Sequence, residues 1–135
     1  MNEIHKSAGV LIEDRKLLIT RAQGKSFFIA PGGKREQNET DEEALIRELQ
    51  EEIAITVESS NIEDFGIWSA EAIGMKDTIV HMRAFIVKSY KGTISPSNET
   101  EEVRWVSSSD LHDIELGSLF KHDVIPKLLE LNLID

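Results

Sequence analysis

The clearest periodicity in the chain is helical. Leu45, Leu49 and Ile53 recur every four residues, so their side chains form one apolar face, and polar residues occupy the opposite side. Thr40 stands three residues before Glu43, and in this arrangement the hydroxyl and the carboxylate each satisfy one free N–H group at a helix start. The pattern predicts a helix that begins near Thr40, ends near Ile53 and docks its apolar face on a core.

The other elements are predicted from shorter runs. Strands are expected where apolar and β-branched residues alternate or cluster, at residues 6–12, 16–21, 27–30, 62–72, 78–88 and 103–106. The first two flank a turn at Glu13 and Asp14, which predicts a hairpin. A second helix is predicted near residues 119–131, where Pro126 suits a first turn or a kink. Strands before and after a central helix are typical of an α/β sandwich, here one domain over residues 1–135.

Three carboxylates lie between the apolar and polar faces of the first helix. Glu48, Glu51 and Glu52 span roughly 100° of its circumference, so their side chains should converge. At about 5 Å and an effective dielectric of about 20, each ionised pair costs on the order of 3 kcal/mol. A hard cation such as Mg²⁺, which prefers a few carboxylates with waters or phosphates, would relieve this repulsion. The alternative is a solvated acidic face.

Two neighbouring features favour the cation site. Pro31, Gly32 and Gly33 precede the helix, and adjacent glycines let the backbone turn sharply and approach an ion or ligand, although an ordinary turn is the alternative. Arg47 lies four residues before Glu51, where its planar fork can hold carboxylates in place. A purely structural surface helix needs no such arrangement.

The segment from Gly33 to Ile55 resembles the Nudix box of the MutT-like superfamily. That pattern is Gly, five residues, Glu, seven residues, Arg-Glu, an aliphatic residue, any residue, Glu-Glu, any residue, Gly and an aliphatic residue. The chain matches it without a gap at Gly33, Glu39, Arg47, Glu48, Leu49, Glu51, Glu52 and Ile55. Only Ala54 departs, since the family has glycine there, and a left-handed alanine would cost about 1 to 2 kcal/mol. Asn38 occupies a place that is often glycine, and asparagine tolerates positive φ.

The resemblance implies a fold and a chemistry. The implied fold is an α/β/α sandwich with a mixed central sheet, and the implied reaction is hydrolysis of a nucleoside diphosphate linked to another group, with Mg²⁺ or alternatively Mn²⁺. Glu48, Glu51, Glu52 and the carbonyl of Gly32 would bind the metal. Either Glu48 or Glu52 would also accept the proton of the attacking water. Arg47 is assigned to the catalytic residues. Arg47 and the first glutamate of the box would together brace the loop and the helix.

A further metal ligand is predicted outside the box. Glu99, Glu101 and Glu102 precede the last strand, and MutT-like enzymes often recruit one more carboxylate from this region. Glu99 is the predicted ligand. A charged loop before an edge strand is the alternative.

Four residues are predicted to contact the substrate. Arg21 and Lys34 lie near the box in sequence and could meet phosphate oxygens, with an ordinary surface cation as the alternative for each. Phe28, or its neighbour Phe27, could stack on a base, but one of the pair must be core if they alternate on a strand. Arg83 is predicted to line the same pocket.

Composition narrows the class of protein. The formal net charge of −10 argues against nucleic-acid binding through a broad basic surface, so a polyanionic substrate would be received by metal ions and a few placed cations. The absence of cysteine excludes a disulfide scaffold and thiol chemistry. No signal-like region or membrane-spanning stretch is present in the sequence, so a cytoplasmic location is expected. Homodimers are common among relatives, but nothing in this sequence indicates an interface.

Three functional classes are consistent with these features. A nucleoside triphosphate pyrophosphohydrolase, acting on ordinary or oxidised nucleotides, is favoured because the chain is compact and shows no insertion for a larger substrate. A hydrolase of ADP-sugars or dinucleoside polyphosphates is the nearest alternative, although the proline or tyrosine that such enzymes often place some sixteen to eighteen residues after the box is missing. A non-catalytic nucleotide-sensing domain is the third class, and the complete set of box carboxylates counts against it.

Overall fold

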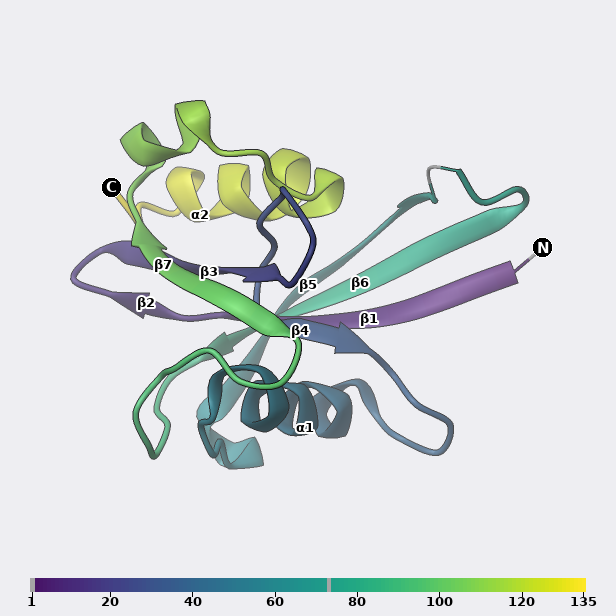
Figure 1. Cartoon of the computed structure of the whole chain (residues 1–135), viewed down its shortest axis with the longest axis horizontal. Coiled ribbons are helices and arrows are strands. Elements are labelled where there is room, and N and C mark those ends of the chain that lie inside the picture. Colours follow the sequence, from purple (N-terminus) through teal and green to yellow (C-terminus); the bar gives the residue numbers. More distant parts are fainter. Residues whose placement is uncertain (1, 73) are drawn as a thin grey trace.

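The computed structural model describes residues 2–72 and 74–135, in which two β-sheets lie between helices (Figure 1). The helix α1 (Asp41–Ile53) covers one side, and a C-terminal helical segment that includes α2 (Ile125–Glu130) covers the other. The strands are β1 (Asn2–Val10), β2 (Ile12–Glu13), β3 (Lys16–Ala22), β4 (Gly32–Lys34), β5 (Ile62–Glu71), β6 (Thr78–Val87) and β7 (Thr100–Val106). The predicted α/β/α layers are confirmed.

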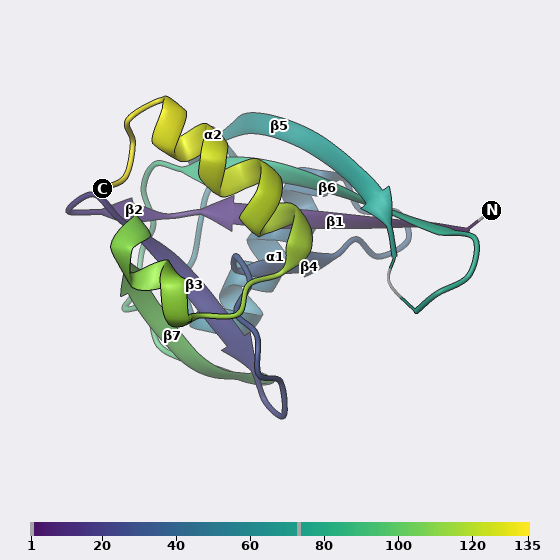
Figure 2. The ribbon, with the colours of Figure 1, turned by 90° about the horizontal axis from the view of Figure 1, so that it is seen from above.

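The larger sheet is mixed, as predicted, and has the order β4-β1-β6-β5. Strand β1 runs parallel to β6 and antiparallel to β4, and β5 runs antiparallel to β6. The smaller sheet has the order β2-β3-β7 and is antiparallel. Figure 2 shows the two sheets from above, with β1 passing between β6 and β4 and leading into β2.

The predicted hairpin of residues 6–12 with residues 16–21 is wrong in its pairing. Of residues 2–13, only the two-residue β2 pairs with β3, at Ile12↔Leu17 and Glu13↔Lys16, whereas residues up to Val10 belong to β1 in the other sheet. The physical reason is burial on both faces. Val10 lies in the core beneath α2 and Leu11 in the core beneath α1, and an isolated hairpin cannot cover both.

The predicted strand at residues 27–30 is also wrong. Phe28 and Ile29 form isolated bridges, Phe28 with Leu116 and Ile29 with Thr20. Each neighbouring segment pairs with a single residue here, and Pro31 follows without an N–H donor, so no continuous ladder forms. The segment is therefore a short connection that leads into β4.

The ends of α1 match their predictions. Both hydrogen bonds of the capping box between Thr40 and Glu43 are present. Ala54 ends the helix in the left-handed conformation, with φ 61° and ψ 33°, and Asn38 also has a positive φ of 69°. The three side chains of the predicted apolar face, Leu45, Leu49 and Ile53, are fully buried. The caps thus set where the helix begins and ends, and its buried apolar face packs it against the sheet.

The C-terminal helix follows the prediction and adds one irregularity. A wider π-type turn covers Phe120–Val124, and Pro126 lies in the first turn of α2 directly after it. Proline has no N–H for the preceding helical turn, and a local π-type turn can absorb this loss. In the described part of the chain, no helix combines the length and apolar character needed to cross a membrane.

Candidate active site

Two glycines bring the backbone of β4 against the carboxylates of α1. The N–H of Gly32 donates to Oε2 of Glu52 at 3.1 Å. Gly32 has φ of 144°, and a Cβ there would overlap the carbonyl oxygen of Ser7. A Cβ on Gly33 would lie 2.7 Å from Cδ of Glu48. The close approach predicted for this glycine turn is therefore made to the side chains of Glu48 and Glu52.

The environment of Glu52 favours its protonated form in the metal-free protein. Burial, together with the neighbouring Glu48 and Glu51, raises the pKa of Glu52 to about 8, against the opposing effect of the Gly32 N–H. A carboxylate that holds a proton at neutral pH is a group that a divalent cation can ionise by taking the place of that proton. The donor chemistry of this pair suits a hard cation.

Arg47 braces the loop and the helix, as predicted. Its Nε and Nη2 donate to the two carboxylate oxygens of Glu39 at 2.7 and 3.0 Å, and its Nη1 donates to Oε1 of Glu48 at 2.9 Å. Nη2 also reaches the carbonyl oxygen of Lys34 at 3.1 Å. The hydrogen bonds from Arg47 hold the pKa of Glu39 at about 2. The guanidinium thus ties three segments of the box together.

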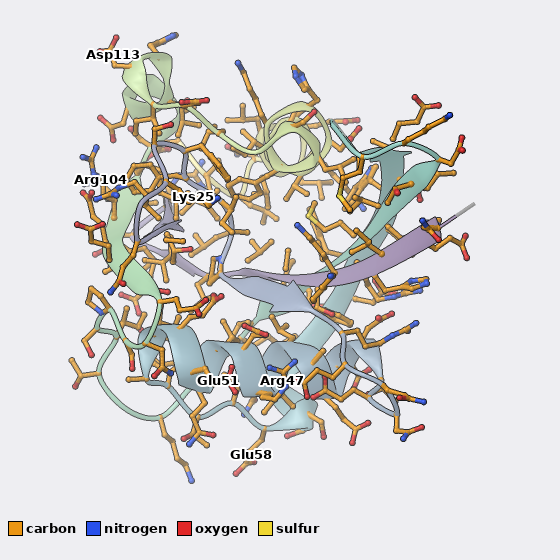
Figure 3. All side chains as sticks on the ribbon, turned by 45° about the vertical axis from the view of Figure 1, so that its right-hand side comes forward. Lys25, Arg47, Glu51, Glu58, Arg104 and Asp113 are labelled. Carbon is orange, nitrogen blue, oxygen red and sulfur yellow. The ribbon has the colours of Figure 1, made fainter. Side chains whose placement is uncertain are left out.

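Glu51 takes part in this brace. Its Oε2 lies 3.2 Å from Nη1 of Arg47, and its side chain is about half exposed. Figure 3 shows Arg47 and Glu51 as neighbours along α1. Within residues 2–72 and 74–135, no three acidic or histidine side chains already form a group that could hold a metal ion. The structure therefore brings Glu48 and Glu52 together, while Glu51 is drawn toward the arginine.

The loop before β7 brings Glu99 to the same end of α1. The N–H of Ser97 donates to the carbonyl of Glu52 at 2.9 Å, and the side-chain amide of Asn98 donates to the carbonyl of Glu51 at 2.7 Å. Glu99 follows directly, and its side chain is exposed. These two hydrogen bonds hold the loop next to the box carboxylates, although no hydrogen bond joins the Glu99 side chain to them.

A hollow of about 330 Å³ opens between β3, β7 and the segment after β7. Figure 3 shows Lys25, Arg104 and Asp113 on three separate segments at this side of the molecule. The residues that line the hollow combine cations, carboxylates and apolar atoms. They are Arg21, Lys25, Ser26, Phe28, Glu102, Arg104, Asp113, Ile114 and Glu115. Two predicted substrate residues, Arg21 and Phe28, therefore share one hollow.

Arg21 is already paired within this hollow. Its guanidinium lies 3.2 Å from a carboxylate oxygen of Glu101 and 3.2 Å from one of Glu102, and these partners raise its pKa. Phe28 is the core member of the Phe27 and Phe28 pair, with 5% of its surface exposed, whereas Phe27 is 36% exposed. The structure thus places both residues at the hollow, with Phe28 forming its floor.

The other two predicted substrate residues lie apart from the hollow. Lys34 ends β4, exposed, next to the box carboxylates. Arg83 is ion-paired to Asp41 at 3.0 Å and to Asp64 at 2.7 Å, in a second hollow at the N-terminal end of α1. The structure brings the backbone of Lys34 to Arg47 of the box and does not bring Arg83 to the hollow that holds Arg21.

Several of the residues that line the hollow were not predicted from the sequence. Arg104 had a usable signal, because it stands two residues after Glu102 on one strand and so shares its face. Lys25, Asp113 and Glu115 had none, since their segments meet only in the fold.

Comparison with known proteins decides the family. A family model described as the NUDIX domain matches residues 3–128. The chain belongs to the Nudix hydrolase family. A solved structure from a study of MutT of Aliivibrio salmonicida and Vibrio cholerae matches this Nudix hydrolase with a TM-score of 0.74 and 25% identity, covering 96% of this chain and 99% of that one.

Relatives of this Nudix hydrolase are named for different substrates. The 8-oxo-dGTP diphosphatase of Proteus vulgaris is 35% identical over 69% of this chain and 83% of the relative. The CTP pyrophosphohydrolase of Escherichia coli is 29% identical over 82% and 80%, respectively. The ADP-ribose pyrophosphatase of Methanocaldococcus jannaschii is 25% identical over 88% and 68%. Nudix hydrolases act on small nucleotide substrates and generally need divalent metal ions.

Proposed function

We propose that this Nudix hydrolase cleaves nucleoside triphosphates, ordinary or oxidised, by attack of water at phosphorus, and releases the nucleoside monophosphate and pyrophosphate. The observation that carries the proposal is the short connection between the hollow and the carboxylates. Phe28 forms the floor of the hollow, and Gly32 donates to Glu52 only four residues later. Such a stretch spans at most about 14 Å. A nucleotide held in the hollow can therefore extend its phosphates to the glycine turn.

The residues that would hold Mg²⁺, or alternatively Mn²⁺, are the carboxylates of Glu48, Glu51, Glu52 and Glu99 and the carbonyl of Gly32. When bound, the ion polarises the phosphates and lowers the pKa of a coordinated water. Glu51 must then exchange its contact with Arg47 for one with the ion. The two hydrogen bonds from Arg47 to Glu39 do not involve Glu51, so they would keep the loop anchored after this exchange.

The proton of the attacking water goes to a carboxylate of the same cluster. Glu48 and Glu52 are the candidates, because they face the glycine turn, whereas Glu51 points outward. A general base works best when its pKa lies near the working pH, and burial raises the pKa of Glu52 to about 8 in the metal-free protein. Lys34 ends the strand that carries the glycine turn and would contact phosphate oxygens, whereas Arg21 lines the hollow and lies over Phe28.

ADP-ribose is the second candidate substrate. The relative from Methanocaldococcus jannaschii, named for that activity, aligns with 88% of this chain. Triphosphates are preferred because the relatives from Proteus vulgaris and Escherichia coli are both named for triphosphate substrates and are more similar in sequence. Both substrates place a nucleoside next to a diphosphate, so the same hollow and carboxylates would serve either one.

The test is a product assay across a substrate panel. Phosphate and pyrophosphate release would be measured with Mg²⁺ and with EDTA, on ordinary and oxidised nucleoside triphosphates, ADP-ribose and dinucleoside polyphosphates. Metal-dependent pyrophosphate release from a triphosphate is the expected result and names the base. Cleavage of ADP-ribose alone would replace the proposal with its alternative, and a folded protein that cleaves nothing on the panel would refute both.

A further inference from the structure

The only aromatic ring among the residues that line the hollow is covered. Phe28 is 5% exposed, and two guanidinium groups lie over its ring. The Cζ atom of Arg104 is 5.0 Å from the ring centroid, and that of Arg21 is 5.9 Å away. A base that enters the hollow therefore meets a guanidinium group before it can meet the ring.

The two guanidinium groups differ in how many hydrogen bonds they donate to other residues. Arg21 donates to Glu101, Glu102 and the carbonyl of Lys25, and its side chain is 22% exposed. Arg104 is anchored through Nε, which donates to Oε2 of Glu102 at 2.6 Å, and its side chain is 48% exposed. The bond through Nε holds Arg104 in place, while about half of its side chain stays exposed at the hollow that it lines.

The charge of the lining indicates which part of a nucleotide lies there. Three cations (Arg21, Lys25 and Arg104) face three carboxylates (Glu102, Asp113 and Glu115), so the lining is formally neutral. A triphosphate carries several negative charges and gains little in such a setting, whereas an uncharged base does not meet the repulsion of the carboxylates. Guanidinium planes are established stacking partners of unpaired bases.

We propose that Arg104 is a specificity-determining residue, whose guanidinium stacks between the ring of Phe28 and the base of the bound nucleotide. The inference rests on the proposed function, because it names how the same site would hold the nucleoside half of its substrate. Glu102 acts as a positioning residue for this stack, since it fixes Arg104 and Arg21 at once.

The test compares Arg104→Lys with the parent protein, because lysine keeps the charge and loses the plane. Binding of AMP and GMP would be measured by calorimetry in EDTA, with ribose 5-phosphate as a ligand that has the sugar and phosphate but no base. The expected result is binding of AMP and GMP weakened on the order of tenfold by the substitution, with ribose 5-phosphate binding unchanged. In the presence of Mg²⁺, KM for the triphosphate rises by a similar factor while kcat is retained.

Arg15→Lys is the matched control. Arg15 is similarly exposed, at 45%, and is paired with Asp135 outside the hollow. This variant should bind all three ligands as the parent does. Thermal unfolding of both variants confirms that the comparison is made between folded proteins.

Three outcomes would overturn the stacking proposal. These are unchanged AMP and GMP binding in Arg104→Lys, an equal loss for ribose 5-phosphate, which would indicate a phosphate contact, and a parent protein that binds ribose 5-phosphate as tightly as AMP and GMP. None of these depends on hydrolysis, so each leaves triphosphate cleavage standing if the panel shows it. If the panel shows ADP-ribose cleavage instead, the proposed function fails and AMP binding still decides the role of Arg104.

Discussion

The N–H of Gly32 donates to the carboxylate of Glu52 across 20 residues of sequence, at 3.1 Å. This bond joins the glycine turn of β4 to the last turns of α1. It supplies one hydrogen-bond donor to a largely buried carboxylate, and the pKa of Glu52 still rises to about 8. The turn and the helix thus hold a carboxylate that is protonated at neutral pH until a cation ionises it.

Glu52 should make the stability of the metal-free protein depend on pH. Its folded pKa of about 8 lies above the unfolded value near 4.5, so the folded state binds more protons between these limits. The free energy of unfolding should fall as pH rises through this window, by up to about 1.4 kcal/mol per pH unit from this group. Urea unfolding in EDTA at pH 5, 6, 7 and 8 would measure it. Glu52→Gln should lack this component, and parallel pH curves for the two proteins would contradict the assignment.

Gly33→Ala should separate site geometry from stability. The added Cβ meets the carboxylate end of Glu48, a flexible group that can swing away, so the fold should survive. Displacing a ligand carboxylate should weaken Mg²⁺ binding and lower kcat/KM at least tenfold. Gly32→Ala provides the contrast, because its Cβ overlaps backbone and should destabilise the protein itself. A Gly33→Ala protein with parent activity would show that Glu48 need not approach the turn.

Arg47→Lys should loosen the brace although the charge is kept. A single ammonium cannot reproduce the paired bonds to Glu39 together with the bond to Glu48. We expect kcat/KM to fall about 10- to 100-fold at saturating Mg²⁺. Glu39→Gln should act through the same contact, so the loss in the double variant should be smaller than the sum of the two single losses. Fully additive losses would mean that the two residues work independently.

The local parts of this site could be predicted from sequence because helical spacing determines them. Glu48, Glu52 and Arg47 lie within six residues on one helix. The left-handed Ala54 stands where the box has glycine, and Asn38 stands where such sequences often have it. The strands were located by alternation, which is also local. The partner of each strand could not be predicted in this way, because β1 pairs with β6 across more than half of the chain.

The hollow could not be predicted because it is assembled from distant segments. Lys25, Arg104 and Glu115 come together only after β3 pairs with β7 and the N–H of Phe28 donates to the carbonyl of Glu115. Phe28 was identified as a candidate, but its burial depends on Arg21 and Arg104, which cover it from two strands. Sequence spacing carries no information on such contacts.

Ala54→Gly should stabilise the protein. Ala54 holds φ 61° and ψ 33°, a conformation that costs an L-residue about 1 to 2 kcal/mol and costs glycine little. We expect the free energy of unfolding to rise by about 1 kcal/mol, measured by urea denaturation. Asn38→Gly is the matched control at another left-handed position, φ 69°, and should gain less because asparagine tolerates it. Equal or absent gains at both positions would argue against strain at Ala54.

The most direct test of the central claim is pyrophosphate release from a nucleoside triphosphate by the parent protein and by Glu52→Gln, each with Mg²⁺ and with EDTA. The parent should release pyrophosphate only with Mg²⁺, and the variant should be slower by orders of magnitude with an unchanged fold, because it lacks both the ligand and the candidate base. Near-normal turnover by a folded Glu52→Gln protein, or parent activity that persists in EDTA, would contradict the account.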